Sequence, residues 1–394
     1  MTAQHFLLGV TGGVAAYKSA ELVRLLIKAG HSVEVAMSES ATRFVSPVTF
    51  QALSGRPVYT DLWDSRPDNN MAHIELTRRA DGFLIAPATA DVLARLAHGQ
   101  CNDLITTLAA ARTCPLAVAP AMNKQMWDNP PNQRNIAQLR GDGVAVFGPG
   151  TGEQACGEVG DGRMLEPEQL ADLLIGLTQR KSLAGRRVLL TAGPTFEPID
   201  PVRGITNLSS GKMGYALARA CRDAGAQVTL ISGPTALACP PEVSYVAAGS
   251  ALAMHAAVMA AVPHHDVFIA VAAVADYRVA NFSQEKMKKT PGDTPVLQLT
   301  ENPDILASVA ALPDAPFCVG FAAESHNLIA HAQAKRQRKK VPLLVANLAQ
   351  HAMGADDNEI VLLDAAGEHP LPRMDKLATA RAIVSYLARL LPER

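Results

Sequence analysis

Several lysines in the second half of the sequence are spaced so that they could hold a phosphorylated compound. Lys335 and Lys339 lie four positions apart in the run KRQRKK, so on a helix they would share one face and could grip a polyphosphate together. Another basic run, KMKK, begins at Lys286 in a polar segment. Positive charge at a helix end also favours the helix dipole, and a basic loop is often only solvated. Phosphate binding and a solvated surface therefore both remain open.

The stretch TAGPTFEPIDPVRGITNLSSGKMG, a long loop over residues 191–214 that leads into a helix, could also bind an anion. Its GK pair resembles a nucleotide-binding P-loop, but Gly204 and Gly211 are too far apart for that motif. Met213 also stands where a serine or threonine would hold magnesium. The backbone amides of residues 210–212 could still bind an anion at the helix N-terminus. An ordinary helix cap by the serine at 209 or 210 is the alternative.

Three segments of the first half could carry chemistry. TGG, at residues 11–13, lies between a strand and a helix, where small residues let the backbone approach a phosphate, although a plain tight turn has the same pattern. TGEQACGEVGDGRM, at residues 151–164, contains a single thiol, Cys156, and its many glycines argue against a packed element and predict a flap or a solvent loop. His73 stands alone in MAHIEL, and a lone histidine is more often structural than catalytic.

Composition narrows the class of protein. The 394 residues contain 36 Lys plus Arg against 37 Asp plus Glu, and no aromatic residues are interleaved with the basic runs, which argues against nucleic-acid binding. The six cysteines are scattered without a CxxC pair, so we expect neither disulfides nor structural zinc, and a reducing cytoplasm fits best. No uninterrupted apolar run reaches the roughly 18 residues of a membrane span, which predicts no membrane segment.

The segments that must position these residues alternate between strands and helices. An apolar run at 6–10, a helical pattern at 14–29 and a second apolar run at 32–37 are typical of a strand, a helix and a strand. The same order recurs from residue 187, with a helix at 212–224. Further buried strands are expected at 82–86, 116–119, 144–147, 267–270, 317–321 and 343–346.

This repeated order indicates two α/β domains. A closing helix at 167–178 precedes a polar, basic joint at 179–186. We therefore expect one domain at 1–180 and another at 187–394, each with a mostly parallel, Rossmann-like sheet covered by helices on both faces. Ligands of such sheets bind beyond the carboxyl ends of the strands, so the loops after the strands should carry the chemistry.

Six motifs give the first half a family resemblance. GVTGGVAAYK, SATRFVSPVTF, HIEL, APATAD, PAMNKQMW and ACGEVGDGRM occur in this order, and together they resemble the flavin-dependent cysteine decarboxylases, specifically phosphopantothenoylcysteine decarboxylase. The resemblance implies a flavodoxin-like domain that binds FMN. It places His73 and Asn123 where the family handles substrate, and Cys156 where it supplies a proton. The implied FMN contacts are Gly12, Gly13, Val14, Ser38, Ser40, Thr89, Ala90, Asp91 and Ala121.

The implied reaction needs a flavin for an electronic reason. Loss of CO2 from an N-acylated cysteine would leave a carbanion without an electron sink, whereas oxidation of the CH2–SH arm to a thioaldehyde creates one. FMN would take up the two electrons and return them after CO2 has left an enethiol. In this scheme Asn123 orients the substrate carboxylate, His73 assists thiol oxidation as a base, and Cys156 protonates the enethiol.

Six further motifs, TAGPTFEPIDPVR, ITNLSSGKMG, AAVADYR, KMKK, ENPDI and GFAAE, occur in order in the second half. They resemble phosphopantothenate-cysteine ligase of the bacterial, CTP-dependent type. The resemblance implies that CTP binds with Mg2+, for which we assign no protein ligand. It makes Asn207 and Lys286 catalytic, and it places Arg203 and Asn207 at the phosphopantothenate end. The implied CTP contacts are Ala270, Val271, Ala272, Asp276, Lys286, Asn302, Pro303, Asp304, Ile305, Phe321, Lys335 and Lys339.

Together the two resemblances imply two successive steps of coenzyme A biosynthesis. The ligase would join 4'-phosphopantothenate to L-cysteine through an acyl-cytidylate, releasing pyrophosphate and CMP. The decarboxylase would then convert 4'-phosphopantothenoylcysteine to 4'-phosphopantetheine and CO2. The same resemblance implies decarboxylase trimers and ligase dimers, which can close into a dodecamer. A peptidyl-cysteine decarboxylase and a non-catalytic regulator on the same fold are the alternatives.

Overall fold

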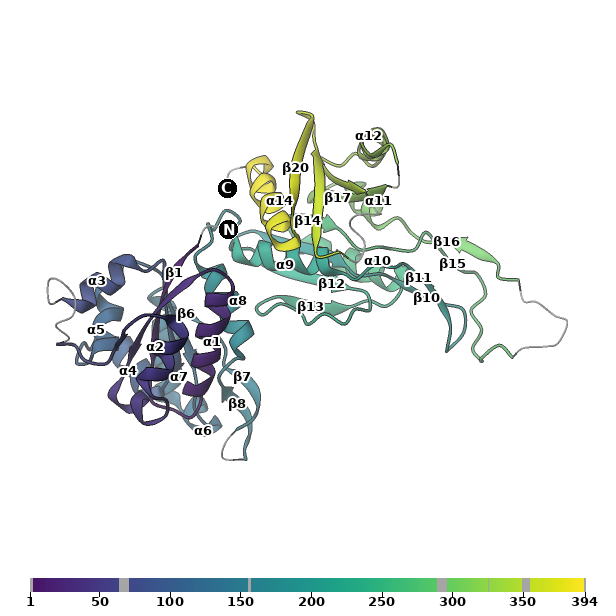
Figure 1. The fold of residues 1–394 in the computed structure, drawn as a ribbon. Helices are drawn as coiled ribbons and strands as arrows, with labels where there is room; N and C mark the ends of the chain where they lie inside the picture. Colours follow the sequence, from purple (N-terminus) through teal and green to yellow (C-terminus); the bar gives the residue numbers. More distant parts are fainter. Residues whose placement is uncertain are drawn as a thin grey trace. The chain divides into compact units, whose positions relative to one another are not determined.

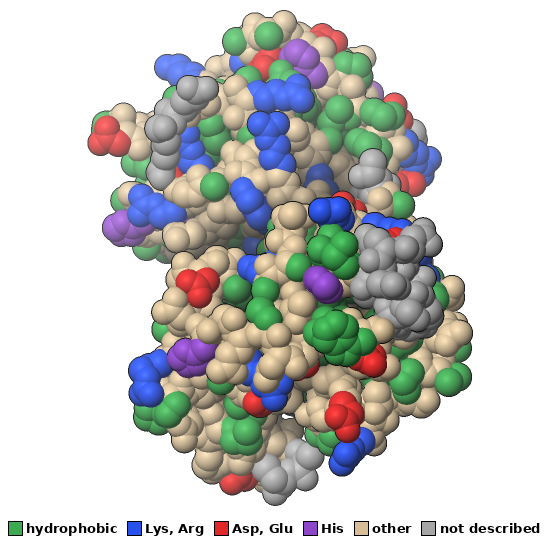
Figure 2. All heavy atoms as spheres, turned by 90° about the vertical axis from the view of Figure 1, so that its left-hand side faces the viewer, with side chains coloured by type: hydrophobic (Ala, Val, Ile, Leu, Met, Phe, Trp, Pro, Cys, Tyr) green, Lys and Arg blue, Asp and Glu red, His purple; other side chains and the backbone are tan. Residues whose placement is uncertain are grey.

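The computed structural model describes residues 3–63, 71–154, 157–288, 296–324, 326–348 and 355–392. The chain divides into two compact units, Met1–Gln179 and Arg180–Arg394, and each has its own large sheet. No helix within these described ranges is long and apolar enough to cross a membrane. On the face drawn in Figure 2, basic and acidic side chains are interspersed with uncharged ones.

The first unit is a six-stranded parallel sheet with helices on both faces (Figure 1). Its elements are β1 His5–Val10, α1 Ala16–Lys28, β2 Ser32–Met37, the 3-10 helix η1 Glu39–Arg43, α2 Pro47–Ser54, β3 Val58–Tyr59, α3 Ala72–Arg79, β4 Gly82–Ala88, α4 Ala90–Ala97, α5 Leu104–Ala111, β5 Leu116–Pro120, α6 Lys124–Asp128, α7 Pro130–Gly141, β6 Ala145–Val146, β7 Gly150–Glu153, β8 Val159–Arg163 and α8 Pro167–Leu177. The strand order is β3-β2-β1-β4-β5-β6, so the chain direction across the sheet reverses between β1 and β4. Such a reversal is where doubly wound sheets bind ligands.

Alternate strand residues of this sheet enter two hydrophobic cores. Phe6 and Leu8 of β1 pack with α1, α2 and α8, whereas Leu7 packs with α3, α4, α5 and α7. β1, β4 and β5 are buried almost throughout because helices cover both faces, which explains their near-continuous apolar sequences. The predicted α/β fold class is confirmed.

The second unit has an eight-stranded sheet. Its elements are β9 Arg187–Ala192, β10 Phe196–Pro198, β11 Gly204–Thr206, α9 Lys212–Asp223, β12 Gln227–Ser232, β13 Ser244–Ala247, α10 Ala251–Ala261, the 3-10 helix η2 Val262–His264, β14 Val267–Ala270, β15 Tyr277–Val279, β16 Leu299–Glu301, α11 Ile305–Ala310, β17 Phe317–Glu324, α12 Leu328–Lys339, β18 Leu343–Leu348, β19 Asp357–Leu363, β20 Glu368–Asp375 and α14 Lys376–Leu390. The order is β13-β12-β9-β14-β17-β18-β19-β20. The strands from β13 to β18 pair in parallel, whereas β19 and β20 are antiparallel additions that the sequence pattern did not indicate. α9 and α14 cover one face, and α10, α11 and α12 cover the other.

The predicted long loop at 191–214 contains a short hairpin. β10 pairs with β11 in antiparallel fashion, and a Cβ atom at Gly204 would lie 2.4 Å from the ring of Phe196, so a larger residue there would displace this ring. α9 begins after Gly211, which has a φ of 75°, and no side chain caps it. The proposed serine cap is therefore wrong, since Ser209 Oγ only accepts a hydrogen bond from the Gly211 amide at 3.3 Å.

Candidate functional sites

The residues predicted to bind FMN follow four strands of the first sheet at the same edge. Gly12, Gly13 and Val14 follow β1, and Ser38 and Ser40 follow β2. The remaining positions follow β4 and β5 and are Thr89, Ala90, Asp91 and Ala121. Because all four strands are parallel, their carboxyl ends meet on either side of the switch point between β1 and β4.

Thr11 joins the two central strands at this edge, although the sequence argument gave it no role beyond the turn. Its hydroxyl donates to the carbonyl oxygen of Pro87 at 2.6 Å and accepts from the amide of Thr89 at 3.3 Å. The side chain is 1% exposed, so both bonds are shielded from water. Thr11 therefore fixes the loop after β1 relative to the loop after β4.

The loop after β1 has the shape of an anion cradle. A Cβ atom at Gly12 would lie 2.4 Å from Ser40 Oγ, whereas the space beside Gly13 is open for 4 Å. Ser38 Oγ and Ser40 Oγ are 3.0 Å apart, so two hydroxyl groups face this space. α1 begins directly afterwards, at Ala16, without a side-chain cap. The amides of Ala16 and Lys18 donate to Gly13 O and Ala15 O, so the two serine hydroxyl groups and the positive end of the helix dipole are the features that fit the phosphate of a flavin mononucleotide.

Asn123 and His73 occupy different elements of the first unit. Asn123 is the N-cap of α6, and its Oδ1 accepts from the amide of Met126 at 2.9 Å. His73 lies in the first turn of α3, and its buried Nδ1 has no hydrogen-bond partner among the described residues. Within those residues no hydrogen bond joins His73 to the loop that carries Asn123. An unpaired buried imidazole nitrogen is costly, so a ligand that completes it would be favoured.

The glycine-rich segment after β6 is a hairpin, which corrects the prediction that its glycines prevent a packed element. β7 and β8 pair in antiparallel fashion, and the hairpin contacts the segment that carries Asn123. The Met122 amide donates to Gly162 O at 2.9 Å, and the Lys124 amide donates to Gln154 Oε1 at 3.0 Å. Glycine at 162 is required for this contact, because a Cβ atom there would lie 2.4 Å from Met122 O. Cys156 itself lies outside the described residues.

A cavity of roughly 330 Å³ opens at the carboxyl edge of the second sheet, and we call it the ligase cavity. Of the residues predicted for ligation, Asn207, Val271, Ala272, Phe321 and Lys335 line it. Sequence reasoning missed several polar lining residues, because single residues at the starts and ends of elements form no recognisable motif. These are Asn347, Asn358 and Lys376, whereas Lys212 belongs to the helix start at 210–212 where the sequence indicated a possible anion site.

The two lysines that were expected to act together have different partners. Lys335 Nζ donates to Phe321 O at 3.0 Å beside the ligase cavity. Lys339 instead forms an ion pair with Asp304, the N-cap residue of α11. Burial, followed by the charge of Lys339, lowers the pKa of Lys335. The two ammonium groups therefore have different hydrogen-bond partners in this structure, although both lie close enough to Asp304 to lower its pKa.

The other predicted CTP contacts surround the loop after β14, whose last residue is Ala270. Asn302 donates through its backbone amide to Asp276 O at 2.8 Å and through Nδ2 to Ala275 O at 2.9 Å. The turn that continues through Pro303 to Ile305 is thereby fixed beside the loop after β14. This turn and Asp276 lie next to the ligase cavity in the fold but do not line it.

Arg203 and Lys286 are connected through a buried carboxylate. Asp200, which is 1% exposed, forms an ion pair with Arg203 and accepts from the Met287 amide at 3.2 Å. Arg203 also donates to Met287 O at 2.8 Å. The hydrogen bond from Arg203 holds the pKa of Asp200 well below its usual range. Arg203 thus positions the segment next to Lys286, and Lys286 itself is exposed.

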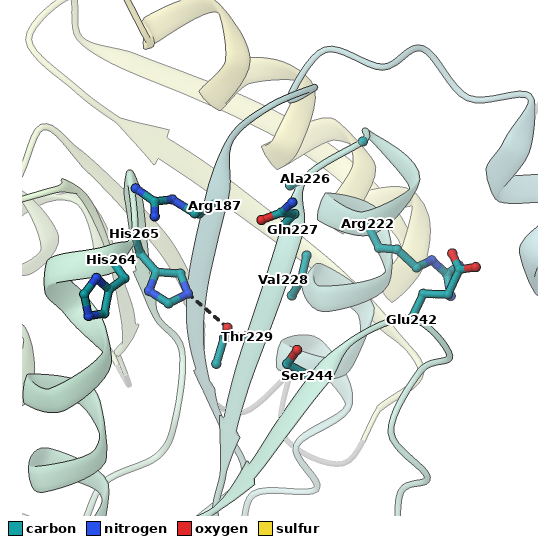
Figure 3. Close-up of a pocket in the computed structure, with 11 residues that line it drawn as sticks. Arg187, Arg222, Ala226, Gln227, Val228, Thr229, Glu242, Ser244, His264 and His265 are labelled. Atoms are coloured by element: carbon teal, nitrogen blue, oxygen red, sulfur yellow. Dashed lines mark hydrogen bonds between the residues drawn. The ribbon is translucent and has the colours of Figure 1, made fainter. Parts of the chain in front are cut away.

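A second cavity of the same unit, of roughly 540 Å³, lies at the amino ends of β9, β12 and β13 (Figure 3). His265 points towards β12 there, and its two ring nitrogens contact Thr229 Oγ1 at 2.9 Å and Ala261 O at 2.8 Å. Burial lowers the pKa of His265, which favours the neutral ring. Arg222 on the other side is bonded to Asp223 and to Pro241 O. Since these polar groups are already satisfied, this cavity offers a ligand little that is specific.

Comparison with known proteins identifies both halves of the chain. Residues 1–179 match the family described as Flavoprotein, and residues 183–391 match the DNA/pantothenate metabolism flavoprotein C-terminal domain. Three relatives carry the name coenzyme A biosynthesis bifunctional protein CoaBC. The one from Vibrio vulnificus strain YJ016 is 48% identical over 99% of both chains. The one from Escherichia coli strain K12 is 46% identical over 94% of this chain and 93% of its own length, and the one from Bacillus subtilis strain 168 is 42% identical over 98% and 97%.

Proposed function

We propose two linked activities for this chain, which belongs to the family of bifunctional coenzyme A biosynthesis proteins. The second unit ligates L-cysteine to 4'-phosphopantothenate with CTP and Mg2+, and the first decarboxylates the product to 4'-phosphopantetheine. The observation that carries the ligase assignment is the ligase cavity, which gathers Asn207, Phe321 and Lys335 at the carboxyl edge of the sheet. A peptidyl-cysteine decarboxylase or a regulator is not favoured, because neither requires the second unit.

The ligation begins with attack of the phosphopantothenate carboxylate on the α-phosphorus of CTP. The bond from that phosphorus to the bridging oxygen breaks, pyrophosphate leaves with the electron pair, and an acyl-cytidylate remains. Lysine side chains around the ligase cavity, with Mg2+, spread the developing charge. Lys286 acts in this step from the segment that Asp200 and Arg203 hold at Met287.

The second step is displacement of CMP by the amine of cysteine. Asn207 suits this step because its Nδ2 already donates to Ala273 O at 3.0 Å, which fixes the amide at the cavity wall. The amide oxygen of Asn207 is then directed by that bond, and it can orient the acyl-cytidylate for attack. The amine forms the new bond to the acyl carbon as CMP leaves with the electron pair, and the amine loses a proton to solvent.

The first unit supplies the groups for decarboxylation. The cradle at Gly12, Ser38 and Ser40 fits the phosphate of FMN, whose bound ring would supply reversible two-electron oxidation of the CH2–SH arm. Asn123 Oδ1 is used by the helix cap, and Nδ2 donates one of its two N–H groups to Gln125 Oε1 at 3.1 Å, so the second N–H of Nδ2 can orient the substrate carboxylate. His73 acts as the base for the thiol, and Cys156 protonates the enethiol.

We also propose that the chain assembles into a homo-oligomer in the cytoplasm. The ligase unit exposes apolar side chains on its two small hairpins, among them Phe196 at 38%, Tyr277 at 51% and Leu299 at 47%. Exposed apolar side chains of this kind favour burial against a second copy. Ligase dimers and decarboxylase trimers would then close into a dodecamer. The cytoplasm remains our expectation because the scattered cysteines fit a reducing compartment.

The proposal is tested by following each substrate through the purified chain. With 4'-phosphopantothenate, CTP, Mg2+ and L-cysteine, we expect pyrophosphate, CMP and CO2 in equal amounts, and a yellow flavin absorbance in the protein. Omission of CTP should stop all products unless 4'-phosphopantothenoylcysteine is added, in which case CO2 alone should appear. Formation of CO2 from a peptide with a C-terminal cysteine, but not from 4'-phosphopantothenoylcysteine, would instead favour the alternative.

A further inference from the structure

Thr195, a buried threonine between β9 and β10, is not used by the proposed mechanism. It is 0% exposed, and its three polar groups each form a hydrogen bond to another segment. The amide donates to Ala273 O at 3.2 Å, and Oγ1 accepts from the Ala275 amide at 3.0 Å. The carbonyl oxygen accepts from Thr206 Oγ1 at 2.8 Å. Thr195 therefore connects β11 with the loop after β14.

The bonds on the side of β11 fix the position of Asn207. Thr206, which bonds to the carbonyl oxygen of Thr195, directly precedes Asn207 in the chain. Asn207 Nδ2 donates to Ala273 O at 3.0 Å, so this carbonyl oxygen accepts from both Asn207 and Thr195. Asn207 and Ala273 line the ligase cavity, whereas Thr195 is not among the described lining residues. Thr195 thus holds Asn207 from behind the cavity wall.

The bond to the loop after β14 supports the side of the cavity proposed for the nucleotide. Ala275, whose amide donates to Thr195 Oγ1, is 5% exposed. Its carbonyl oxygen accepts from Asn302 Nδ2 at 2.9 Å, and the Asn302 amide donates to Asp276 O at 2.8 Å. Asp276 and Asn302 are both among the residues proposed to bind CTP. One hydroxyl group therefore links the support of Asn207 to the support of the nucleotide.

The backbone beside Thr195 has little freedom to move. A Cβ atom at Gly233 would lie 1.7 Å from Pro194 O, so the loop after β12 packs directly against the residue before Thr195. Pro194 also forms a parallel β-bridge with Ala273. Because the Ala275 amide is buried, loss of its acceptor would leave an unpaired donor, which is unfavourable unless the loop moves to another acceptor or to water. Removal of this one hydroxyl group should therefore shift the loop after β14 relative to β11.

We propose that Thr195 is a positioning residue that sets the distance between the two substrates of the ligation. This inference rests on the proposed ligase activity. In the first step an oxygen of the phosphopantothenate carboxylate bonds to the α-phosphorus of CTP, and pyrophosphate leaves with the electron pair of the broken bond. The carboxylate is held from the side of Asn207 and the phosphorus from the side of Asp276, and Thr195 joins these two supports. It touches neither substrate and transfers no proton. A displacement of about 1 Å between reacting groups costs about a hundredfold in rate.

Thr195→Val tests this role in the full-length chain, because it removes the hydroxyl group and keeps the branched shape of the side chain. With labelled 4'-phosphopantothenate, CTP and Mg2+ but no cysteine, a quenched single turnover should form acyl-cytidylate about tenfold or more slowly. Titration calorimetry with CTP, and separately with 4'-phosphopantothenate, should give unchanged affinities, because each substrate alone depends on only one of the two supports. Thr195→Ser restores the acceptor and should recover the rate. Thr229→Val, which removes a hydroxyl contact with His265 at 2.9 Å at the amino edge of the sheet, is the matched control and should alter neither quantity.

Counting of binding sites separates slow catalysis from poor folding. Each rate is divided by the number of CTP sites found in the same titration, so unfolded protein is not counted as slow enzyme. Thr206→Val provides a second route, because Thr206 is exposed and its hydroxyl group supports β11 through the carbonyl oxygen of Thr195. This variant should also slow acyl-cytidylate formation without weakening the binding of either substrate.

Each outcome of these experiments decides the assignment. A normal rate per site in Thr195→Val would overturn the positioning role, and so would a slow rate that Thr195→Ser does not recover. Weaker binding of both substrates to Thr195→Val, with a normal rate in Thr206→Val, would show a purely structural role and would also overturn it. If the wild-type chain forms no acyl-cytidylate, the proposed ligase activity fails and the inference fails with it. If the wild-type chain and both valine variants form acyl-cytidylate equally fast, the ligase activity stands and only the inference fails.

Discussion

The contact between the β7–β8 hairpin and the segment carrying Asn123 gives a sharp test of the decarboxylase assignment. Gly162→Ala would place a Cβ atom 2.4 Å from Met122 O, at a residue whose φ of +132° already disfavours a side chain. The neighbouring atom belongs to the backbone and cannot rotate away, so the hairpin must move by about 0.6 Å or more to reach a normal contact. Displacements approaching 1 Å near reacting groups cost about a hundredfold in rate. We therefore expect decarboxylation to fall by about two orders of magnitude.

The bifunctional chain supplies its own control for this variant. Cysteine-dependent release of CMP reports the ligase unit, and it should not change in Gly162→Ala. CO2 release from added 4'-phosphopantothenoylcysteine reports the other unit and should fall. Gly141→Ala, where a Cβ atom would meet nothing within 4 Å, should leave both rates unchanged. Normal CO2 release by Gly162→Ala would refute the idea that hairpin docking positions the catalytic groups.

Three further predictions use other residues. Cys156→Ser should accumulate the enethiol together with reduced flavin, seen as a loss of visible absorbance after one turnover, and 4'-phosphopantetheine formed at the normal rate would contradict its role. Without cysteine, Asn207→Asp should release pyrophosphate and retain the acyl-cytidylate. Lys286→Gln should form no acyl-cytidylate, because it loses about 3 kcal/mol of transition-state stabilisation. Acyl-cytidylate in Lys286→Gln but not in Asn207→Asp, measured in a quenched reaction with labelled phosphopantothenate, would overturn both assignments. Burial and a hydrogen bond to Asp364 raise the pKa of Tyr386 from 10.0 to about 12. The protonated phenol therefore contributes fully to the free energy of unfolding below pH 10, and this contribution is lost as the pH rises from about 10 to 12. Tyr386→Phe should lack this alkaline loss when unfolding is followed by circular dichroism, and identical pH profiles would contradict the role of that bond.

The parallel strands were predictable from the sequence because a strand that is buried on both faces consists of a continuous run of apolar residues. β4 and β18 are continuous apolar runs, and the structure only extends them, to Ala88 and Leu348. β20 left no such trace, because its residues are largely exposed and it contains two prolines among charged side chains. β20 can contain prolines because it lies at the edge of the sheet, where only one side of the strand has to donate backbone N–H groups to a neighbouring strand.

The candidate sites were harder to predict than the fold because helical spacing specifies a face but no partner. Lys335 and Lys339 do share a helix, yet Asp304, a residue distant in sequence, takes Lys339 as its counterion. Asn347 and Asn358 are recognised as members of one site only because both line the ligase cavity in the structure. Motif order located the loops correctly at the strand ends, whereas pairings between distant loops required the structure.

The composition of the ligase cavity has a consequence for how the protein is made. Its walls include Asn207 near the start of the second unit and Lys376 at the start of the last helix. That helix also completes the core, where Ile383 and Leu387 pack in the same cluster as Leu217 of α9. When the whole first unit has left the ribosome, the second unit therefore still lacks α14, which forms one wall of the ligase cavity. During synthesis the fold of the first unit can form first, whereas the cavity proposed for CTP is complete only after α14 has been made.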